Sequence, residues 1–305
     1  MEGKALARWR EYASRREGRE AAKEDKRNEL RAERTIMQIR LNGEVAVVTG
    51  GGGVLCGAMS RALAWAGSSV AVLDARSEAA VVVAEGIESK GGKAIPVVCD
   101  VLDRRSLEAA AEEVERRLGA VTILVNGAGG NRKEATCRPG CEFFDLPTDA
   151  IQWVLNLNFL GTLLPCQVFG RGMAARKRGT IVNVSSMNAF RPLTMIPAYS
   201  AAKAAVTNFT KWLAVHMSQE YSTSIRVNAI APGFFQTDQN RFLLETEAGE
   251  LTERGRQILE HTPMERFGTE DDLLGTLLWL VSPQASFVHG IVVPVDGGFS
   301  AYSGV

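Results

Sequence analysis

From Val45 to the end of the chain, short runs rich in β-branched residues alternate with amphipathic stretches of helical length. This alternation is typical of βαβ units, in which buried strands lie parallel and helices cover the sheet. The candidate strands are residues 45–49, 70–74, 94–98, 121–125, 180–185, 225–229 and 291–295. Because most connections between them are short, we predict a single α/β domain with a doubly wound parallel sheet of about seven strands.

Two of the helical stretches are long and cover residues 151–177 and 198–220. A third segment, residues 234–269, is polar and helical and precedes the last helix. Surface insertions of this kind often carry binding residues. We interpret residues 234–269 as a small helical lid over the substrate, within a domain that spans residues 41–305.

Residues 1–40 differ from the rest, because Arg, Lys and Glu alternate with Ala and few large apolar residues recur at a helical period. This pattern predicts a charged N-terminal extension, partly helical or disordered, that lies outside the core. Its surplus of basic residues would also suit an arm that binds a partner or nucleic acid. A third interpretation is that the natural protein starts at Met37.

The composition excludes several classes of protein. The formal net charge is zero at pH 7, so no global field attracts nucleic acid or an anionic membrane. No apolar run reaches the roughly 18 residues that a membrane span needs, and the first residues are charged where a secretory signal would be apolar. An odd number of cysteines, five, suits reduced thiols. We therefore expect a cytoplasmic protein with a small-molecule substrate.

The sequence does not predict a metal site. Cys137 and Cys141 form a lone C-x3-C pair, and the three histidines are scattered along the chain. A structural zinc ion needs four such ligands, so we expect no bound metal.

The first strand leads into four consecutive glycines, residues 50–53, and then into a helix. Glycine lets the backbone approach a ligand closely, and the amides at a helix N-terminus attract a pyrophosphate. Asp74 follows 24 residues after Gly50, at the end of the second strand. A glycine-rich turn in this context predicts a Rossmann-type dinucleotide site.

The carboxylate of Asp74 can accept hydrogen bonds from ribose hydroxyls and would repel a 2′-phosphate, which favours NAD over NADP. Arg76 could instead hold a 2′-phosphate, although a solvated residue at a helix start is the simpler interpretation. Further candidates follow the third and fourth strands, where they are either ligands or ordinary turn residues. These candidates are Asp100, Val101, Asn126, Ala128 and Gly129.

A catalytic group is indicated after the fifth strand. Ser186 follows this strand, Tyr199 comes 13 residues later, and Lys203 lies four residues beyond Tyr199 on the same helical face. An ammonium beside a phenol favours phenolate, so we expect Lys203 to lower the pKa of Tyr199 toward working pH. A serine hydroxyl can stabilise the charge that develops on the substrate oxygen. Such a group suits alcohol oxidation and carbonyl reduction.

From about Leu41 onward, over about 265 residues, the chain resembles the short-chain dehydrogenase/reductase family. The motifs occur in the family's order: the glycine-rich turn, Asn-x-Ala-Gly at 126–129, a helical Asn158, Ser186, Tyr-x3-Lys and Pro-Gly at 232–233. The resemblance implies that Asn158 holds a proton-relay water near Lys203. One departure is that the family's second and third glycines fall on Val54 and Cys56, which leaves the detailed phosphate-loop geometry open.

The resemblance also implies that Pro232, Gly233 and Thr237 line the nicotinamide and pyrophosphate, and that the protein forms a homo-oligomer, a tetramer or a dimer. The complete set of expected cofactor-binding residues is Gly50, Gly53, Val54, Leu55, Asp74, Asp100, Val101, Asn126, Ala128, Gly129, Tyr199, Lys203, Pro232, Gly233, Phe235 and Thr237.

Within that family, residues 185–194, 231–235 and 296–305 look like the D-mannonate oxidoreductases of the short-chain type, also called D-fructuronate reductases. These interconvert D-mannonate and D-fructuronate with a nicotinamide cofactor. An arginine fork suits the carboxylate of such a substrate. The expected substrate-binding residues are Ser186, Asn188, Arg191, Tyr199, Gln239, Asn240 and Arg241.

Two alternatives remain at this point. The first is a related sugar, sugar-acid, polyol or 3-oxoacyl reductase of the same family, such as a gluconate 5-dehydrogenase-like enzyme, which differs only in its substrate pocket. The second is a non-catalytic regulator that binds a dinucleotide. The presence of Asn158, Ser186, Tyr199 and Lys203 at workable spacing favours an enzyme.

Overall fold

The computed structural model describes residues 39–236, 244, 246 and 249–304. Leu41–Val305 forms one compact unit. The predicted charged extension falls almost entirely on residues 1–38, outside the described residues.

The core of this unit is a seven-stranded sheet in which all neighbouring strands are parallel, in the order β3-β2-β1-β4-β5-β6-β7. The strands are β1 (Val45–Thr49), β2 (Ser69–Asp74), β3 (Lys93–Val98), β4 (Ile123–Asn126), β5 (Gly179–Val184), β6 (Ile225–Pro232) and β7 (Val292–Val295). The prediction of a doubly wound parallel sheet is confirmed. The strand order reverses at β1, between β2 and β4, and ligands of open parallel sheets bind at such a reversal.

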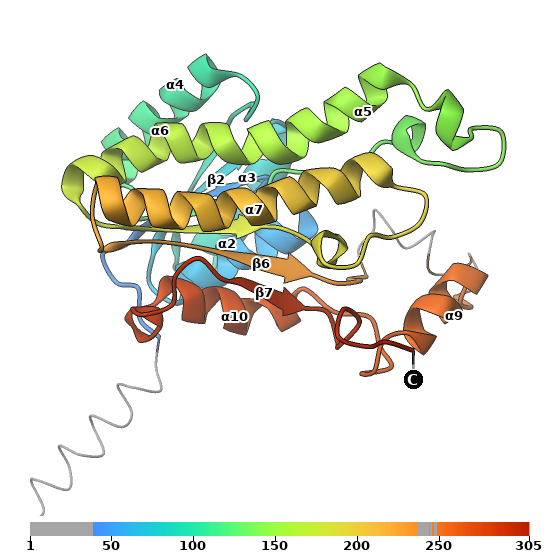
Figure 1. Ribbon diagram of the computed structural model, residues 1–305. Helices are drawn as coiled ribbons and strands as arrows, with labels where there is room; N and C mark the ends of the chain where they lie inside the picture. Colours follow the sequence, from blue (N-terminus) through green and yellow to red (C-terminus); the bar gives the residue numbers. More distant parts are fainter. Residues whose placement is uncertain (1–38, 237–243, 245, 247–248, 305) are drawn as a thin grey trace, which may run out of the picture. The chain divides into compact units, whose positions relative to one another are not determined.

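Helices cover both faces of the sheet. They are α2 (Val54–Trp65), α3 (Ser77–Glu88), α4 (Arg104–Leu118), α5 (Thr148–Leu155), α6 (Gly161–Arg176), α7 (Pro197–Glu220), α9 (Glu253–Glu260) and α10 (Asp271–Val281). Figure 1 shows α6 and α7 on one side of the sheet and α10 on the other. Buried side chains of α4, α6 and α7 form one apolar cluster with β1, β2 and β3, including Leu107, Phe169 and Met217.

The long helical stretch predicted over residues 151–177 is divided by a π-helical turn. A turn of this type, η3 (Asn156–Leu160), separates α5 from α6. π-helical turns inside α-helices occur frequently at functional sites, because the extra residue redirects the side chains on that face. Here the turn carries the fully buried Asn158.

The insertion between β6 and α10 is closed at its base. Phe235 and Gly268 form a parallel bridge, Gly268 N donates to Phe234 O at 2.8 Å, and Gln236 N donates to Gly268 O at 3.0 Å. The described part of the insertion contains α9. Within the described residues, no helix is both long and apolar enough to cross a membrane.

Candidate active site

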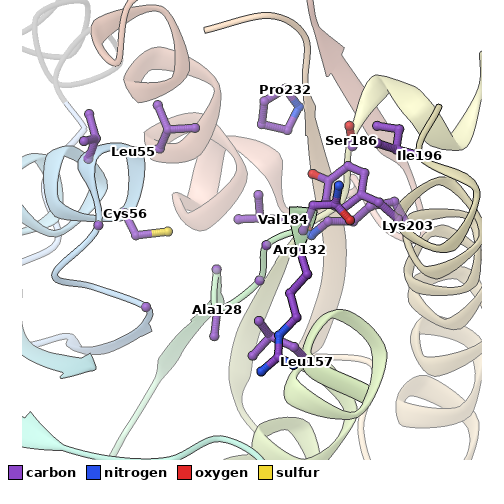
Figure 2. A pocket seen from close by; sticks show the side chains of 18 of the residues that line it. Leu55, Cys56, Ala128, Arg132, Leu157, Val184, Ser186, Ile196, Lys203 and Pro232 are labelled. Atoms are coloured by element: carbon purple, nitrogen blue, oxygen red, sulfur yellow. The ribbon is translucent and has the colours of Figure 1, made fainter. Parts of the chain in front are cut away.

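A cavity of about 1170 Å³ lies at the carboxyl ends of the strands. Its wall is formed by the turn after β1, the end of β2, the loop after β4, the end of β5, the first turns of α7, the end of β6 and α9. Figure 2 shows Ser186, Ile196 and Lys203 on one side of a pocket and Leu55 and Cys56 on the other. The cavity therefore joins the predicted dinucleotide turn to the predicted catalytic residues.

The glycine-rich turn brings the backbone close to the neighbouring strand. Gly50 has φ +63°, and a Cβ there would lie 2.9 Å from Ala128 Cα, so a side chain is excluded by conformation and by space. Thr49 Oγ1 accepts hydrogen bonds from the amides of Gly127 and Ala128 at 3.1 and 3.2 Å, which fixes the loop after β4 against this turn. Gly53 is the N-cap of α2 and has no side chain that could bond the first amides of the helix. These amides, at the cavity wall, can therefore bind an anionic ligand.

Asp74 is almost fully buried at the end of β2, and two backbone amides orient its carboxylate. Gly52 N donates to Oδ2 at 3.1 Å and Arg76 N donates to Oδ1 at 3.0 Å. Each oxygen keeps a lone pair that can accept a hydroxyl. The Arg76 guanidinium is mostly exposed, with its Nε 3.6 Å from Asp74 Oδ1.

Most residues that were predicted to bind the dinucleotide line this one cavity. They are Gly50, Gly53, Val54, Leu55, Asp74, Asp100, Val101, Ala128, Gly129, Tyr199, Lys203, Pro232, Gly233 and Phe235. Asn126 does not line it, because its amide points into the sheet, where Nδ2 donates to Asn183 Oδ1 at 2.9 Å and to Cys166 Sγ at 3.1 Å. Thr237 lies outside the described residues.

Ser186 and Tyr199 share a side-chain hydrogen bond at the cavity wall. Lys203, one turn after Tyr199 on α7, places its Nζ 5.7 Å from the centre of the Tyr199 ring and donates to Val184 O at 2.8 Å. The end of β5 and the start of α7 thus hold the three groups together.

Burial pushes both titratable groups toward their neutral forms. It raises the pKa of Tyr199, although the hydrogen bond with Ser186 acts in the opposite direction. It also lowers the pKa of Lys203 to about 8. The expected net lowering of the Tyr199 pKa is therefore wrong, because desolvation of the phenolate outweighs the hydrogen bond with Ser186.

Asn158 lies behind the cavity wall. Its Nδ2 donates to Gly130 O at 2.7 Å and to Val154 O at 2.8 Å, while Oδ1 accepts from Gly130 N at 3.2 Å. A Cβ on Gly129 would lie 2.7 Å from Asn158 Oδ1 and 3.3 Å from Lys203 Nζ. The buried amide thus fixes the loop after β4 next to Lys203, and its role with a relay water stays a prediction.

The expected substrate-binding residues do not all lie in one cavity. Ser186 and Tyr199 line the main cavity, whereas Asn188 lines an adjoining cavity of about 520 Å³ that shares Cys137 and Met195 with the first. Arg191 lines neither, because its side chain lies at the exposed surface, where Nε donates to Ser300 O at 3.2 Å. Gln239, Asn240 and Arg241 lie outside the described residues.

Several cavity residues were not predicted from the sequence. The loop after β4 contributes Arg132, whose guanidinium lies 3.9 Å from the centre of the Trp153 ring, and the exposed Lys133 and Arg138. The sequence feature that could have indicated these three residues is the basic stretch directly after the Asn-x-Ala-Gly motif. No comparable feature of the sequence indicated Arg254, on α9. Among the residues that the structure describes, no cluster of three or more His, Cys, Asp or Glu side chains could hold a metal ion.

Comparisons with known proteins agree with this geometry. The family model for short chain dehydrogenases matches residues 44–248. An uncharacterised oxidoreductase of Bacillus subtilis, UxuB, is 50% identical over 87% of this chain and 98% of its own length. The chain belongs to the short-chain dehydrogenase family. It is an oxidoreductase of that family.

Two solved short-chain dehydrogenases show the range of relatives. A protein of Haemophilus influenzae with bound NAD, provisionally assigned as a D-mannonate oxidoreductase, is 46% identical with a TM-score of 0.83, over 87% of this chain and 98% of its own. A gluconate 5-dehydrogenase of Burkholderia cenocepacia, in complex with NADP and tartrate, is 31% identical with a TM-score of 0.77, over 87% and 98% of the two chains.

The structure also explains how this short-chain dehydrogenase accommodates its departure from the family's glycine pattern. Cys56 occupies the third glycine position and is buried, with its thiol against Gly127: a Cβ on Gly127 would lie 2.1 Å from Cys56 Sγ. The missing side chain at Gly127 makes room for the thiol. Burial raises the pKa of Cys56 to about 12, so the thiol stays neutral beside the glycine-rich turn.

Proposed function

We propose that this chain is an NAD-dependent oxidoreductase that interconverts D-mannonate and D-fructuronate, with Tyr199 as general acid and base. The observation that carries the proposal is the joint presence of Ser186, Tyr199 and Lys203 on the wall of a cavity that also contains Asp74. A cavity of about 1170 Å³ has room for a dinucleotide and a small substrate together.

In the proposed reaction, Tyr199 removes the proton of the substrate hydroxyl during oxidation and returns it during reduction. The hydroxyl of Ser186 donates a hydrogen bond to the same substrate oxygen. Lys203 supplies positive charge next to Tyr199 and holds the ribose near the nicotinamide. A bound nicotinamide supplies the hydride acceptor or donor.

The cofactor assignment rests on Asp74. Its oriented carboxylate suits the hydroxyls of an adenosine ribose and opposes a 2′-phosphate. NADP is the alternative, because Arg76 is close enough to Asp74 to turn toward a phosphate. The relative with bound NAD supports NAD as the cofactor. Because another relative binds NADP, the test below includes both cofactors.

The substrate assignment rests on similarity and on polarity. The Haemophilus influenzae relative supports D-mannonate, and the relative with bound tartrate supports a hydroxy acid. The buried Asn188 Oδ1, at the adjoining cavity, lacks a hydrogen-bond partner among the described residues, and a hydroxyl-rich substrate that extends into that cavity would supply a donor. A gluconate 5-dehydrogenase-like activity is the second candidate, because the same groups would serve it.

A homo-oligomer and a cytoplasmic location belong to the same proposal. Trp212 and Val215 on α7 are both more than half exposed, which is typical of a surface that another subunit covers. The five cysteines, Cys56, Cys99, Cys137, Cys141 and Cys166, are all free, which suits a reducing compartment.

The proposal is tested with a substrate panel. Formation of the reduced cofactor, NADH from NAD and NADPH from NADP, is measured side by side for D-mannonate, D-gluconate and D-mannitol. We expect the highest kcat/KM with D-mannonate and NAD. Faster turnover of D-mannitol, or of a 3-oxoacyl thioester with the reduced cofactor, would leave only the dehydrogenase assignment standing.

A further inference from the structure

The helix α9 carries two arginines that face in different directions. Arg254 is partly buried and lines the main cavity. Arg256 is exposed and already paired, because its Nη2 lies 3.2 Å from Glu253 Oε2 and its Nη1 donates to Leu251 O at 3.0 Å. Two residues of the same type on one helix thus have opposite surroundings.

Packing fixes the direction in which Arg254 points. Thr252 caps α9 through a hydrogen bond from Gly255 N at 3.0 Å, and Thr252 N donates to Leu244 O at 2.9 Å. A Cβ on Gly255 would lie only 2.3 Å from Leu244 O, so this side of the helix is in close contact with the chain before it. Arg254 shares a helix face with the buried Ile258, four residues later, and therefore points inward.

The other cations on the cavity wall already have partners or lie in solvent. Lys203 donates to Val184 O, Arg76 lies beside Asp74, and Arg132 is stacked on Trp153. Lys133 and Arg138 are exposed.

Within residues 39–236, 244, 246 and 249–304, Arg254 has no acidic ion-pair partner. Burial lowers the pKa of its guanidinium with no neighbouring charge to offset the shift. The guanidinium remains protonated at neutral pH, because its ordinary pKa is above 12. A partly buried cation without an anion is costly, so this position gains from an anionic ligand.

We propose that Arg254 binds the carboxylate of the substrate and thereby selects sugar acids over neutral sugars. The inference rests on the proposed function and specifies the residue that recognises the acid. A planar guanidinium can donate two parallel hydrogen bonds to a carboxylate, and a neutral hydroxymethyl group cannot replace them. Arg254 thus takes the role that was predicted for Arg191 or Arg241.

The anion could also be the pyrophosphate of the dinucleotide, which has the same charge chemistry. The topology favours the substrate. Arg254 belongs to the insertion after β6. In the sheet, β6 lies next to β5, and the end of β5 leads into Ser186. The glycine-rich turn and Asp74 belong to β1 and β2, on the other side of β4.

The test compares the unaltered enzyme with Arg254→Met, Arg254→Lys and the matched control Arg256→Met. For each, kcat/KM is measured with D-mannonate and with D-mannitol, its neutral counterpart, and the Kd for NAD is measured by protein fluorescence. We expect Arg254→Met to lose about 30- to 100-fold in kcat/KM for D-mannonate, mainly through KM. Activity with D-mannitol and the Kd for NAD should change less than about threefold.

Arg254→Lys should recover part of the loss, and Arg256→Met should behave like the unaltered enzyme. A D-mannonate KM unchanged in Arg254→Met would overturn the proposal, as would an equal loss for D-mannitol, which would indicate general damage to the site. A weakened Kd for NAD would assign Arg254 to the pyrophosphate instead. If the unaltered enzyme uses D-mannitol and ignores D-mannonate, the proposed function itself fails, and this outcome is visible before any variant is made.

Discussion

At the proposed catalytic centre, Tyr199 and Lys203 show how burial shifts protonation. Both side chains are shielded from water, so the pKa of the phenol rises and the pKa of the ammonium falls to about 8. The two pKa values, ordinarily 10.0 and 10.5, therefore move apart, and both groups are favoured in their neutral forms. A neutral Tyr199 carries the proton that it would donate to the substrate oxygen during carbonyl reduction.

The lowered pKa of Lys203 predicts a pH-dependent stability. In the folded chain the pKa is about 8, against an ordinary value of 10.5, so the unfolded state binds more protons between pH 8 and 10.5. The penalty for burying the ammonium is fully present below pH 8 and disappears as the pH rises through 10.5. The variant Lys203→Met has no ammonium at this position, so its stability does not change with pH for this reason.

We therefore expect the free energy of unfolding of the unaltered protein to rise by up to about 3 kcal/mol relative to Lys203→Met over this pH range. The lost hydrogen bond to Val184 O adds a constant and does not affect the slope. Urea denaturation of both proteins at about pH 7 and about pH 10 measures the difference. A constant difference between the two pH values would show that Lys203 has an ordinary pKa.

Asp74 is expected to determine which cofactor the protein prefers. Asp74→Ala removes the acceptor for the ribose hydroxyls and the repulsion of a 2′-phosphate, so the preference for NAD should shrink by about tenfold or more. The Kd values for NAD and NADP, measured for both proteins, give the ratio directly. Tighter binding of NADP by the unaltered protein would refute the assignment and make Arg76 a phosphate ligand.

Single residues differ in how far the sequence can place them. The glycine-rich turn, Asp74 and the Tyr-x3-Lys group could be predicted, because short spacing along one strand end or one helix face fixes their positions. Asn126 was expected at the dinucleotide, but its amide contacts Asn183 and it does not line the cavity, and the sequence alone does not tell which way a polar residue at a strand end turns. Arg254 could not be predicted, because its direction depends on the contact of Gly255 with Leu244.

Whole elements were easier to predict than residues. All seven strands exist, and their bounds differ by a few residues at most, the largest difference being at β6, which continues to Pro232 because it pairs with β7 up to Val295. The π-helical turn inside the long helical stretch was not predicted. One extra residue in a helix changes the apolar pattern too little to be seen in a sequence, whereas the backbone of Asn156–Leu160 shows the turn in the structure.

The exposed side chain of Trp212 on α7 indicates an interface between subunits. Trp212 is 56% exposed and stacks on His216, with ring centres 4.7 Å apart. If a second copy covers this surface, Trp212→Glu should reduce the mass of the assembly in solution, because a carboxylate would be buried without a partner. Trp65 on α2 is equally exposed, at 54%, and lies under Lys90, so Trp65→Glu is the matched control.

Light scattering after size-exclusion chromatography measures the masses. The same mass for the unaltered protein and Trp212→Glu would move the interface to another face or show that the protein is a monomer. A mass loss in Trp65→Glu as well would point to a general effect of the added charge.

For the molecule as a whole, the parallel sheet and the cavity at its carboxyl edge bring the predicted site residues together. β1 and β2 hold the glycine-rich turn and Asp74, β5 and α7 hold Ser186, Tyr199 and Lys203, and the segment after β6 completes the wall. We propose that in this arrangement Tyr199 transfers the proton in a dinucleotide-dependent oxidation of a sugar acid.

The most direct test compares NADH formation from D-mannonate by the unaltered protein, by Tyr199→Phe and by Tyr302→Phe, together with the Kd for NAD. Tyr302 is partly exposed near the C-terminus and serves as the control. We expect Tyr199→Phe to lose about a thousandfold in kcat with the Kd for NAD changed less than about twofold, because only the exchangeable proton is removed. Activity in Tyr199→Phe within about tenfold of the unaltered protein would show that Tyr199 does not transfer the proton.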